Sequence, residues 1–369
     1  MSGIYLHIPF CKSKCAYCNF FSVVSDKQRT DFLDALKREA LNRKDYLGGE
    51  EVKTVYLGGG TPSLLEPSEI FDILKFLGDN YQLIATPEIT LEANPDTVSK
   101  ESLFEYKSIG INRLSIGIQS FFDDDLQCLS RKHDSKHALQ VLEWAKEAGF
   151  QEVTLDLIYG IPTLTEEKWR KNLEIFFSTG FNHLSAYALT VEEKTTLGQR
   201  INKGAAAPVS EEETIKHYQI LVEMTENQGF EHYEISNFAC PGHYSKHNTI
   251  YWKGEKYLGL GPSAHSFDGV SRQWNVASVK DYCDNYSFER EELTLNDRYN
   301  EYVMTGLRTN WGCNIDYIRT TFGEKYAEKF KNETKKHILS GKMFQKDQNF
   351  ILTSTGMLFA DGIAAELFA

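Results

Sequence analysis

The sequence lacks any apolar run of about eighteen residues, the length that a membrane-crossing helix needs. Its first residues also lack the positively charged segment and apolar stretch of a secretory signal. Basic side chains are in deficit, with 40 Lys and Arg against 52 Asp and Glu and a net charge of -12. Phosphate binding needs clustered Lys and Arg, so this balance argues against a nucleic-acid partner. We therefore expect a cytoplasmic protein without an integral membrane segment.

Cysteine is also sparse and odd in number, which argues against a disulfide framework. Three of the seven cysteines form a C-x3-C-x2-C cluster of Cys11, Cys15 and Cys18, after an apolar run that ends in Pro9. This pattern predicts a loop at the end of a first strand. The other four are scattered, and we interpret them as buried apolar residues.

Clustered thiolates are ligands for soft metals, and cysteine is the usual ligand of iron-sulfur clusters. Three cysteines would leave one iron of a 4Fe-4S cluster without a protein thiolate. A structural zinc site and a disulfide are the alternatives. The spacing fits zinc poorly, because structural zinc is normally closed by four ligands.

Strand and helix patterns alternate through the first half of the chain, whose 369 residues suggest about two domains. After the first strand, the expected strands cover 52–57, 88–93, 113–118, 152–158 and 183–189. The expected helices cover 26–47, 66–77, 99–109, 135–148 and 166–178. Such alternation is typical of parallel βαβ units, and six of them predict a partial (β/α)6 barrel of the TIM type.

Polar or glycine-rich motifs follow four of these strands. Gly58-Gly59-Gly60-Thr61-Pro62 follows the second strand, and Glu92, Gln119 and Asp156 lie at the ends of the next three. Each alone is consistent with a turn or a helix cap. Because parallel strands end at the same rim, we expect the four motifs to converge there.

The remaining chain divides into two further regions. The barrel is assigned to residues 1–197, an extension to 198–290, and a C-terminal domain to 291–369. Residues 198–209 are interpreted as a linker or a lid, and 247–252 read His-Asn-x-x-Tyr-Trp. Helices followed by a hairpin at 342–352 predict a winged-helix-like α+β domain, interpreted as a docking or capping unit.

The cysteine spacing, with Tyr17 before Cys18, resembles the signature of radical S-adenosylmethionine (SAM) proteins. The run Tyr-x-His-Ile-Pro-Phe-Cys at 5–11 resembles the family of oxygen-independent coproporphyrinogen III oxidase (HemN). The resemblance implies a 4Fe-4S cluster on the three cysteines and SAM beside it, with Glu92 and Arg131 contacting its methionine and ribose region and Gln119 and Asp156 its ribose. The implied SAM-binding residues are Tyr5, Tyr17, Gly59, Gly60, Thr61, Glu92, Gln119, Arg131, Asp156 and Thr190.

The His-Asn-x-x-Tyr-Trp run resembles the motif of HemW-type haem chaperones, relatives of that oxidase. It implies that His247 contributes to haem binding, with His265 as the second candidate, although a lone histidine is more often structural. The implied partners are haem or porphyrin and a haem-acceptor protein. Transient contact with membrane-bound haem proteins is left open, and so is the choice between monomer and dimer.

Two departures from the oxidase favour the chaperone. Asn19-Phe20 follows Cys18 where the oxidase has a fourth cysteine, and Tyr5 lies almost at the start, where the oxidase has an extension. The alternatives are a coproporphyrinogen III dehydrogenase, which converts propionates to vinyl groups, and a zinc-stabilised barrel without redox chemistry. No catalytic residue is assigned.

Overall fold

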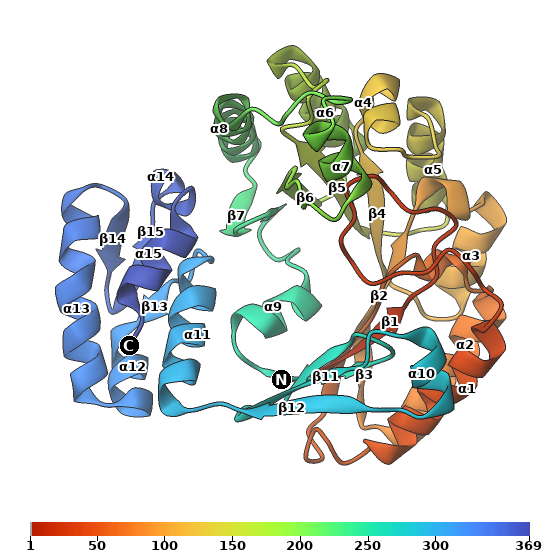
Figure 1. Ribbon diagram of the computed structural model, residues 1–369, viewed down its shortest axis with the longest axis horizontal. Coiled ribbons are helices and arrows are strands. Elements are labelled where there is room, and N and C mark those ends of the chain that lie inside the picture. The colour runs from red at the N-terminus through yellow and green to blue at the C-terminus, as the bar shows by residue number, and fades with distance from the viewer. Residues whose placement is uncertain (1) are drawn as a thin grey trace.

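The computed structural model describes residues 2–369, which form a large sheet flanked by helices and a smaller C-terminal domain (Figure 1). The large sheet has twelve strands in the order β12-β11-β10-β9-β1-β2-β3-β4-β5-β6-β8-β7, and the small sheet has three in the order β13-β15-β14. Within these residues, no helix is both long and apolar enough to cross a membrane. The partial barrel with a C-terminal α+β domain that the sequence predicts is confirmed.

Six neighbouring parallel strands form the barrel wall. They are β1 (Ser2–Ile8), β2 (Val52–Gly59), β3 (Leu83–Ala93), β4 (Arg113–Gln119), β5 (Glu152–Tyr159) and β6 (His183–Ala188). All seven residues of β4 are buried, as expected for a parallel strand covered on both faces. The wall is open, because β6 pairs with β8 and β1 pairs with β9 instead of with each other.

Amphipathic helices cover the outside of this wall (Figure 1). They are α1 (Arg29–Asn42), α2 (Pro67–Asn80), α3 (Lys100–Ser108), α5 (Ser135–Glu147) and α6 (Glu166–Thr179), with the short α4 (Asp123–Cys128) and the 3-10 turns η1 (Pro62–Leu64) and η2 (Pro95–Thr97) between them. In α5, Asp134 accepts a hydrogen bond from the N–H of His137 and so caps the helix. Buried Ala138, Val141 and Leu142 share one face of it.

A second group of strands extends the sheet beyond β1. It consists of β9 (Lys256–Leu260), β10 (His265–Phe267), β11 (Ser271–Asn275) and β12 (Phe288–Glu292), with α10 (Val279–Asp284) before β12. Buried Glu39 on α1 ties this extension to the barrel, accepting hydrogen bonds from Arg43, from Gly261 N–H at 2.8 Å and from Asn275 at 2.8 Å. The Tyr282 hydroxyl donates a fourth bond to Glu39 at 2.6 Å. A fully satisfied buried carboxylate of this kind fixes one packing arrangement.

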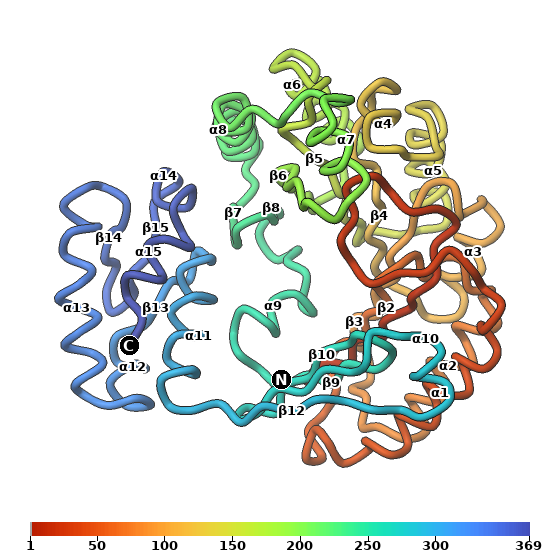
Figure 2. Tube along the Cα trace, in the orientation of Figure 1, coloured from red at the N-terminus to blue at the C-terminus, as the bar shows by residue number. Residues whose placement is uncertain are grey.

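Between β6 and β9 the chain forms a bridge towards the C-terminal domain. Its elements are α7 (Thr196–Asn202), α8 (Glu211–Asn227), β7 (Glu231–Glu234), β8 (Asn237–Ala239) and α9 (Lys246–Trp252). The linker expected over 198–209 is thus helical in its first part, where Thr195 caps α7 by accepting the N–H of Gly198. Figure 2 shows α9 lying between the barrel and the C-terminal domain.

The C-terminal domain combines helices with a short hairpin. It contains α11 (Leu295–Leu307), β13 (Cys313–Asn314), α12 (Ile315–Phe322), α13 (Glu324–Leu339), β14 (Met343–Lys346), β15 (Asn349–Leu352), α14 (Ser354–Met357) and α15 (Ala360–Leu367). It meets the preceding region through an ion pair between Arg272 and Glu301 at 3.0 Å. Asn310 N–H also donates to the Tyr233 carbonyl at 3.0 Å.

Candidate functional site

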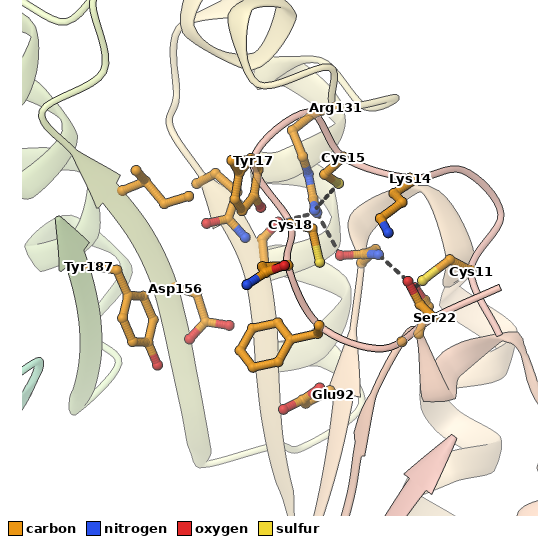
Figure 3. A pocket seen from close by; sticks show the side chains of 18 of the residues that line it. Cys11, Lys14, Cys15, Tyr17, Cys18, Ser22, Glu92, Arg131, Asp156 and Tyr187 are labelled. Carbon is orange, nitrogen blue, oxygen red and sulfur yellow. Dashed lines mark hydrogen bonds between the residues drawn. The ribbon is translucent and has the colours of Figure 1, made fainter. Parts of the chain in front are cut away.

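A cavity of about 470 Å³ lies at the carboxyl ends of the barrel strands (Figure 3). The strands β2, β3, β4 and β6 each contribute at least one residue at or beyond their ends, and β5 contributes Asp156 and Ile158 from its second half. The cysteine loop after β1 covers the cavity from the side. The motifs that the sequence places after separate strands therefore share one site. In parallel α/β barrels this rim is where ligands bind.

The three clustered cysteines line this cavity and point into it from the loop (Figure 3). All three are free thiols and partly exposed. Thr61 Oγ1 donates to Cys11 Sγ at 3.6 Å, and Arg131 Nη1 donates to Cys15 Sγ at 3.5 Å. Such donors stabilise the thiolate form and tune iron-sulfur clusters.

The spacing of these sulfurs also bears on what they can hold. Among residues 2–369, no three His, Cys, Asp or Glu side chains converge closely enough to hold a single metal ion. A four-iron cluster takes each thiolate on a separate iron. A cavity wall with three separate sulfurs and donors beside two of them fits that arrangement.

Backbone hydrogen bonds hold the cysteine loop in place. Val23 N–H donates to the Pro9 carbonyl at 2.8 Å, which closes the loop at its base. Ala16 N–H donates to the Leu129 carbonyl at 3.2 Å, and the Ala16 carbonyl accepts from Leu197 N–H at 2.8 Å. The loop is therefore tied to segments from two distant parts of the chain.

Two carboxyl groups line the cavity below the loop. Glu92 accepts hydrogen bonds from the Tyr56 hydroxyl at 2.7 Å and from Gly59 N–H at 3.1 Å. Burial raises the pKa of Glu92, and these hydrogen bonds partly offset that effect. Burial, and then the charge of Glu92, raise the pKa of Asp156 to about 7. A cationic ligand would stabilise both carboxylates, because a nearby opposite charge favours the ionised form.

Gln119 and Gly60 show that the backbone is shaped for close contact with a ligand. Gln119 adopts a left-handed φ of 69°, is 7% exposed, and its Oε1 has no hydrogen-bond partner among residues 2–369. Such strain and an unpaired buried oxygen are typical of functional sites. At Gly60 an alanine Cβ would lie 2.6 Å from the Phe10 carbonyl oxygen. The rim therefore offers an acceptor for a ligand hydroxyl or N–H and has no space for a side chain at Gly60.

Most of the residues predicted to bind the cluster or SAM lie in this cavity wall. They are Cys11, Cys15, Tyr17, Cys18, Gly59, Gly60, Thr61, Glu92, Gln119, Arg131, Asp156 and Thr190. Tyr5 does not line the cavity, and its hydroxyl is hydrogen-bonded to His7 Nδ1 at 3.1 Å. A direct contact between Tyr5 and SAM stays a prediction.

The two histidines proposed for haem lie in different surroundings. His247 on α9 is 1% exposed and lies outside the cavity wall. Its Nδ1 is hydrogen-bonded to Thr54 Oγ1 at 2.7 Å, and its Nε2 to the Tyr251 hydroxyl at 2.8 Å. His265 is exposed, with its ring stacked on that of Trp274. Haem ligation by His247 stays a prediction, and the observed geometry does not favour it because neither ring nitrogen is free.

Three cavity residues of note escaped the sequence analysis as ligand-binding candidates. Asn94 joins two predicted residues, since its Oδ1 accepts from Arg131 at 2.6 Å and its Nδ2 donates to Thr61 at 3.1 Å. It directly follows the end of β3, which was a usable signal. Tyr187 on β6 and Phe20, which is 72% exposed, lie in the same wall.

Comparisons with known proteins agree with this site. Residues 5–176 match the Radical SAM superfamily, and residues 293–359 match the HemN C-terminal domain. The chain is 34% identical to the heme chaperone HemW of Bacillus subtilis, over 98% of both chains. The chain belongs to the HemW family. It is also 31% identical to the heme chaperone HemW of Mycobacterium tuberculosis, over 99% of this chain and 94% of the relative.

The solved structure of coproporphyrinogen III oxidase (HemN) from Escherichia coli, a radical SAM enzyme, has the same architecture. It superposes with a TM-score of 0.86 at 25% identity, covering 100% of this chain and 90% of the oxidase. As a radical SAM family, HemW implies a 4Fe-4S cluster and SAM. The three cysteine thiols fit the cluster, and the unpaired Gln119 oxygen together with the carboxyls of Glu92 and Asp156 fits SAM.

Proposed function

We propose that this HemW-family protein is a haem chaperone that binds a 4Fe-4S cluster, SAM and haem, and passes haem to an acceptor protein. The observation that carries the proposal is 34% identity to a heme chaperone over 98% of both chains. The cavity geometry supports the cluster and SAM parts of it independently. Haem transfer to an acceptor rests on the relatives alone.

Within the cavity, different residues would bind the cluster and different parts of SAM. Cys11, Cys15 and Cys18 would hold the cluster, which with SAM supplies one-electron redox chemistry when bound. Glu92 would receive the ammonium group of SAM, because it is a half-buried carboxylate in the cavity wall whose hydrogen bonds in residues 2–369 come from the neutral Tyr56 hydroxyl and Gly59 N–H. Gln119 would accept a ribose hydroxyl with its unpaired oxygen.

Haem requires a second place, since the cavity has the volume of a single drug-sized ligand. His265 is the accessible one of the two histidines, and Trp274 beside it offers an aromatic face. Neutral imidazole is a common axial ligand of haem iron. We therefore include His265 as the haem ligand in the proposal.

A second candidate function is oxidation of coproporphyrinogen III, as in the structurally similar HemN. The TM-score of 0.86 over the whole chain favours it. Against it stands Phe20, which lines the cavity and occupies the place of the fourth cysteine in the C-x3-C-x2-C-x-C pattern of the oxidase. The two functions differ in product and not in fold.

Two anaerobic measurements test the proposal, and the first concerns the cluster site that both functions share. The wild type, Cys15→Ala and the control Cys240→Ala are reconstituted with iron and sulfide, and iron-sulfur absorption is recorded. We expect Cys15→Ala to lose this absorption and Cys240→Ala to keep it, because Cys240 lies outside the cavity wall. Equal absorption in all three would contradict the cluster site.

The same preparations are then given haem, or SAM with coproporphyrinogen III. Haem binding in the wild type without porphyrin products would support the chaperone, and protoporphyrinogen would support the oxidase. We expect His265→Ala to shift the haem absorption band and lower haem affinity. Unchanged spectra would exclude His265 as the ligand without affecting the cluster result.

A further inference from the structure

Helix α9 closes the barrel at the end opposite the cavity. Its His247 is hydrogen-bonded to Thr54, the third residue of β2, and a Cβ on Gly3 of β1 would lie 3.2 Å from His247 Nδ1. The backbone N–H of His247 donates to Glu88 Oε1 on β3 at 2.9 Å. Three adjacent strands therefore hold this one residue.

Within this floor His247 is neutral and fixed in orientation. Burial lowers its pKa to about 3, so the ring carries no charge near neutral pH. Thr54 and Tyr251 occupy its two nitrogens, and its ring plane stacks on the ring of Tyr56 with centroids 5.0 Å apart and an angle of 26°. A histidine held by two hydrogen bonds and one stack has a single available rotamer, and it presents a flat face to Tyr56.

Tyr56 connects this floor to the cavity. Its hydroxyl donates to Glu92 Oε1 at 2.7 Å. Tyr56 therefore contacts His247 with its ring and the Glu92 carboxylate of the large cavity with its hydroxyl. A small polar cavity of about 50 Å³ lies beside this contact, lined by Tyr56, Glu92, Asp156 and Asn248 among others. The residue after His247 thus faces the same two carboxyls. A cavity of this size and polarity holds a few water molecules at most.

We propose that His247 is a positioning residue for the SAM site: it fixes the ring of Tyr56, whose hydroxyl holds Glu92 in the orientation that receives the ammonium group of SAM. The inference rests on the proposed binding of SAM. It assigns to the His-Asn-x-x-Tyr-Trp run a role in SAM binding rather than in haem ligation. The path runs from Thr54 and Tyr251 through His247 and Tyr56 to Glu92.

The test measures SAM affinity in the reconstituted full-length protein by equilibrium dialysis, with haem affinity measured in parallel by absorption titration. Tyr56→Phe removes only the hydroxyl, and His247→Phe keeps a ring while removing both hydrogen bonds. We expect each to raise the SAM dissociation constant, Tyr56→Phe by about tenfold, which is the lower end of the range for one hydrogen bond to a charged group. Haem affinity should stay at the wild-type value.

The double variant distinguishes positioning from general damage. If His247 acts through Tyr56, Tyr56→Phe combined with His247→Phe should bind SAM no more weakly than Tyr56→Phe alone. The matched control is His232→Phe. His232 also stacks on an aromatic ring, that of Phe238 with centroids 4.2 Å apart, and neither residue lines the SAM cavity. This control should leave SAM affinity unchanged whatever it does to the melting temperature.

Several outcomes would overturn the inference. The first is unchanged SAM affinity in either single variant, and the second is a double variant whose SAM dissociation constant rises by the product of the two single-variant increases. The third is an equal loss of SAM affinity in His232→Phe. The fourth is a loss of haem affinity in His247→Phe while its SAM affinity stays intact. If His247→Phe fails to fold, Thr54→Val removes one of its two partners and must still weaken SAM binding. A wild type that binds no SAM would instead refute the proposed function.

Discussion

Replacing Glu92 by glutamine should separate ligand affinity from fold stability. The side chain keeps its shape, and both present donors can still be satisfied. The glutamine oxygen can accept Gly59 N–H in place of the carboxylate oxygen now 3.1 Å away. The Tyr56 hydroxyl can turn to accept from the amide, because a tyrosine hydroxyl both donates and accepts. The substitution therefore removes the charge while Gly59, Tyr56 and residue 92 each keep at least one hydrogen bond.

The two expected effects have opposite signs. A hydrogen bond to a charged group contributes about 1.5–3 kcal/mol, so loss of the one to the ammonium group of SAM should weaken binding by about 10- to 150-fold. In the absence of SAM, burial raises the pKa of Glu92, which means that its ionised form is disfavoured in the folded state. Glutamine removes this penalty, so the free energy of unfolding without SAM should be unchanged or higher.

Equilibrium dialysis gives the SAM affinity, and urea unfolding of the SAM-free protein gives the stability. The reasoning would be refuted by wild-type SAM affinity in Glu92→Gln. It would also be refuted if the free energy of unfolding of SAM-free Glu92→Gln fell so far that a partly unfolded protein explained the weaker SAM binding. Only weaker binding in an equally stable protein agrees with a carboxylate placed for a cationic ligand.

Three further predictions concern the frame of the site. Gly60→Ala should lower the free energy of unfolding, measured with urea, by about 1–3 kcal/mol, because its Cβ would lie 2.6 Å from a backbone oxygen. The control Gly78→Ala has open space around it and should raise the free energy of unfolding by about 0.5–1 kcal/mol. Tyr282→Phe should cost about 1.5–3 kcal/mol by the same assay, since Glu39 loses one donor in a buried network, and no measurable loss would contradict that network. Asp156 has a folded pKa of about 7 against an ordinary value near 4, so the folded state holds a proton that the unfolded state loses. The SAM-free wild type should therefore lose stability as pH rises from about 4 to 7, and Asp156→Asn should lack this loss. Stability profiles of the two proteins that run parallel over this pH range would refute the prediction.

The barrel wall could be predicted from the sequence because its signals are local. The strands at 113–118 and 152–158 are short segments rich in Leu, Ile and Val, and the structure places β4 at Arg113–Gln119 and β5 at Glu152–Tyr159. Residues at strand ends, such as Gln119, could be placed on one rim because parallel strands end together. No knowledge of side-chain partners was needed for that step.

The floor of the barrel could not be predicted in this way. The helix α9 has seven residues, too few for a helical period to be recognised. His247 is buried by partners such as Thr54, which lies 193 positions earlier in the chain, and a sequence pattern carries no information about such a pair. Ser115, which also lines the large cavity, could not be recognised for a related reason: it lies inside β4, and its bond to Asp156 at 3.2 Å spans 41 positions.

The position of α9 limits where haem can bind if this protein is a chaperone. Beneath the rim, the polar cavity of about 50 Å³ beside Tyr56 and Glu92 has no room for a macrocycle. Above it, the cavity of about 470 Å³ suits one ligand of the size of SAM. Haem bound together with SAM must then lie at the outer surface, where His265 and Trp274 are found. A surface site would also leave haem within reach of an acceptor protein, so cavity-filling substitutions inside the barrel should weaken SAM binding and leave haem binding intact.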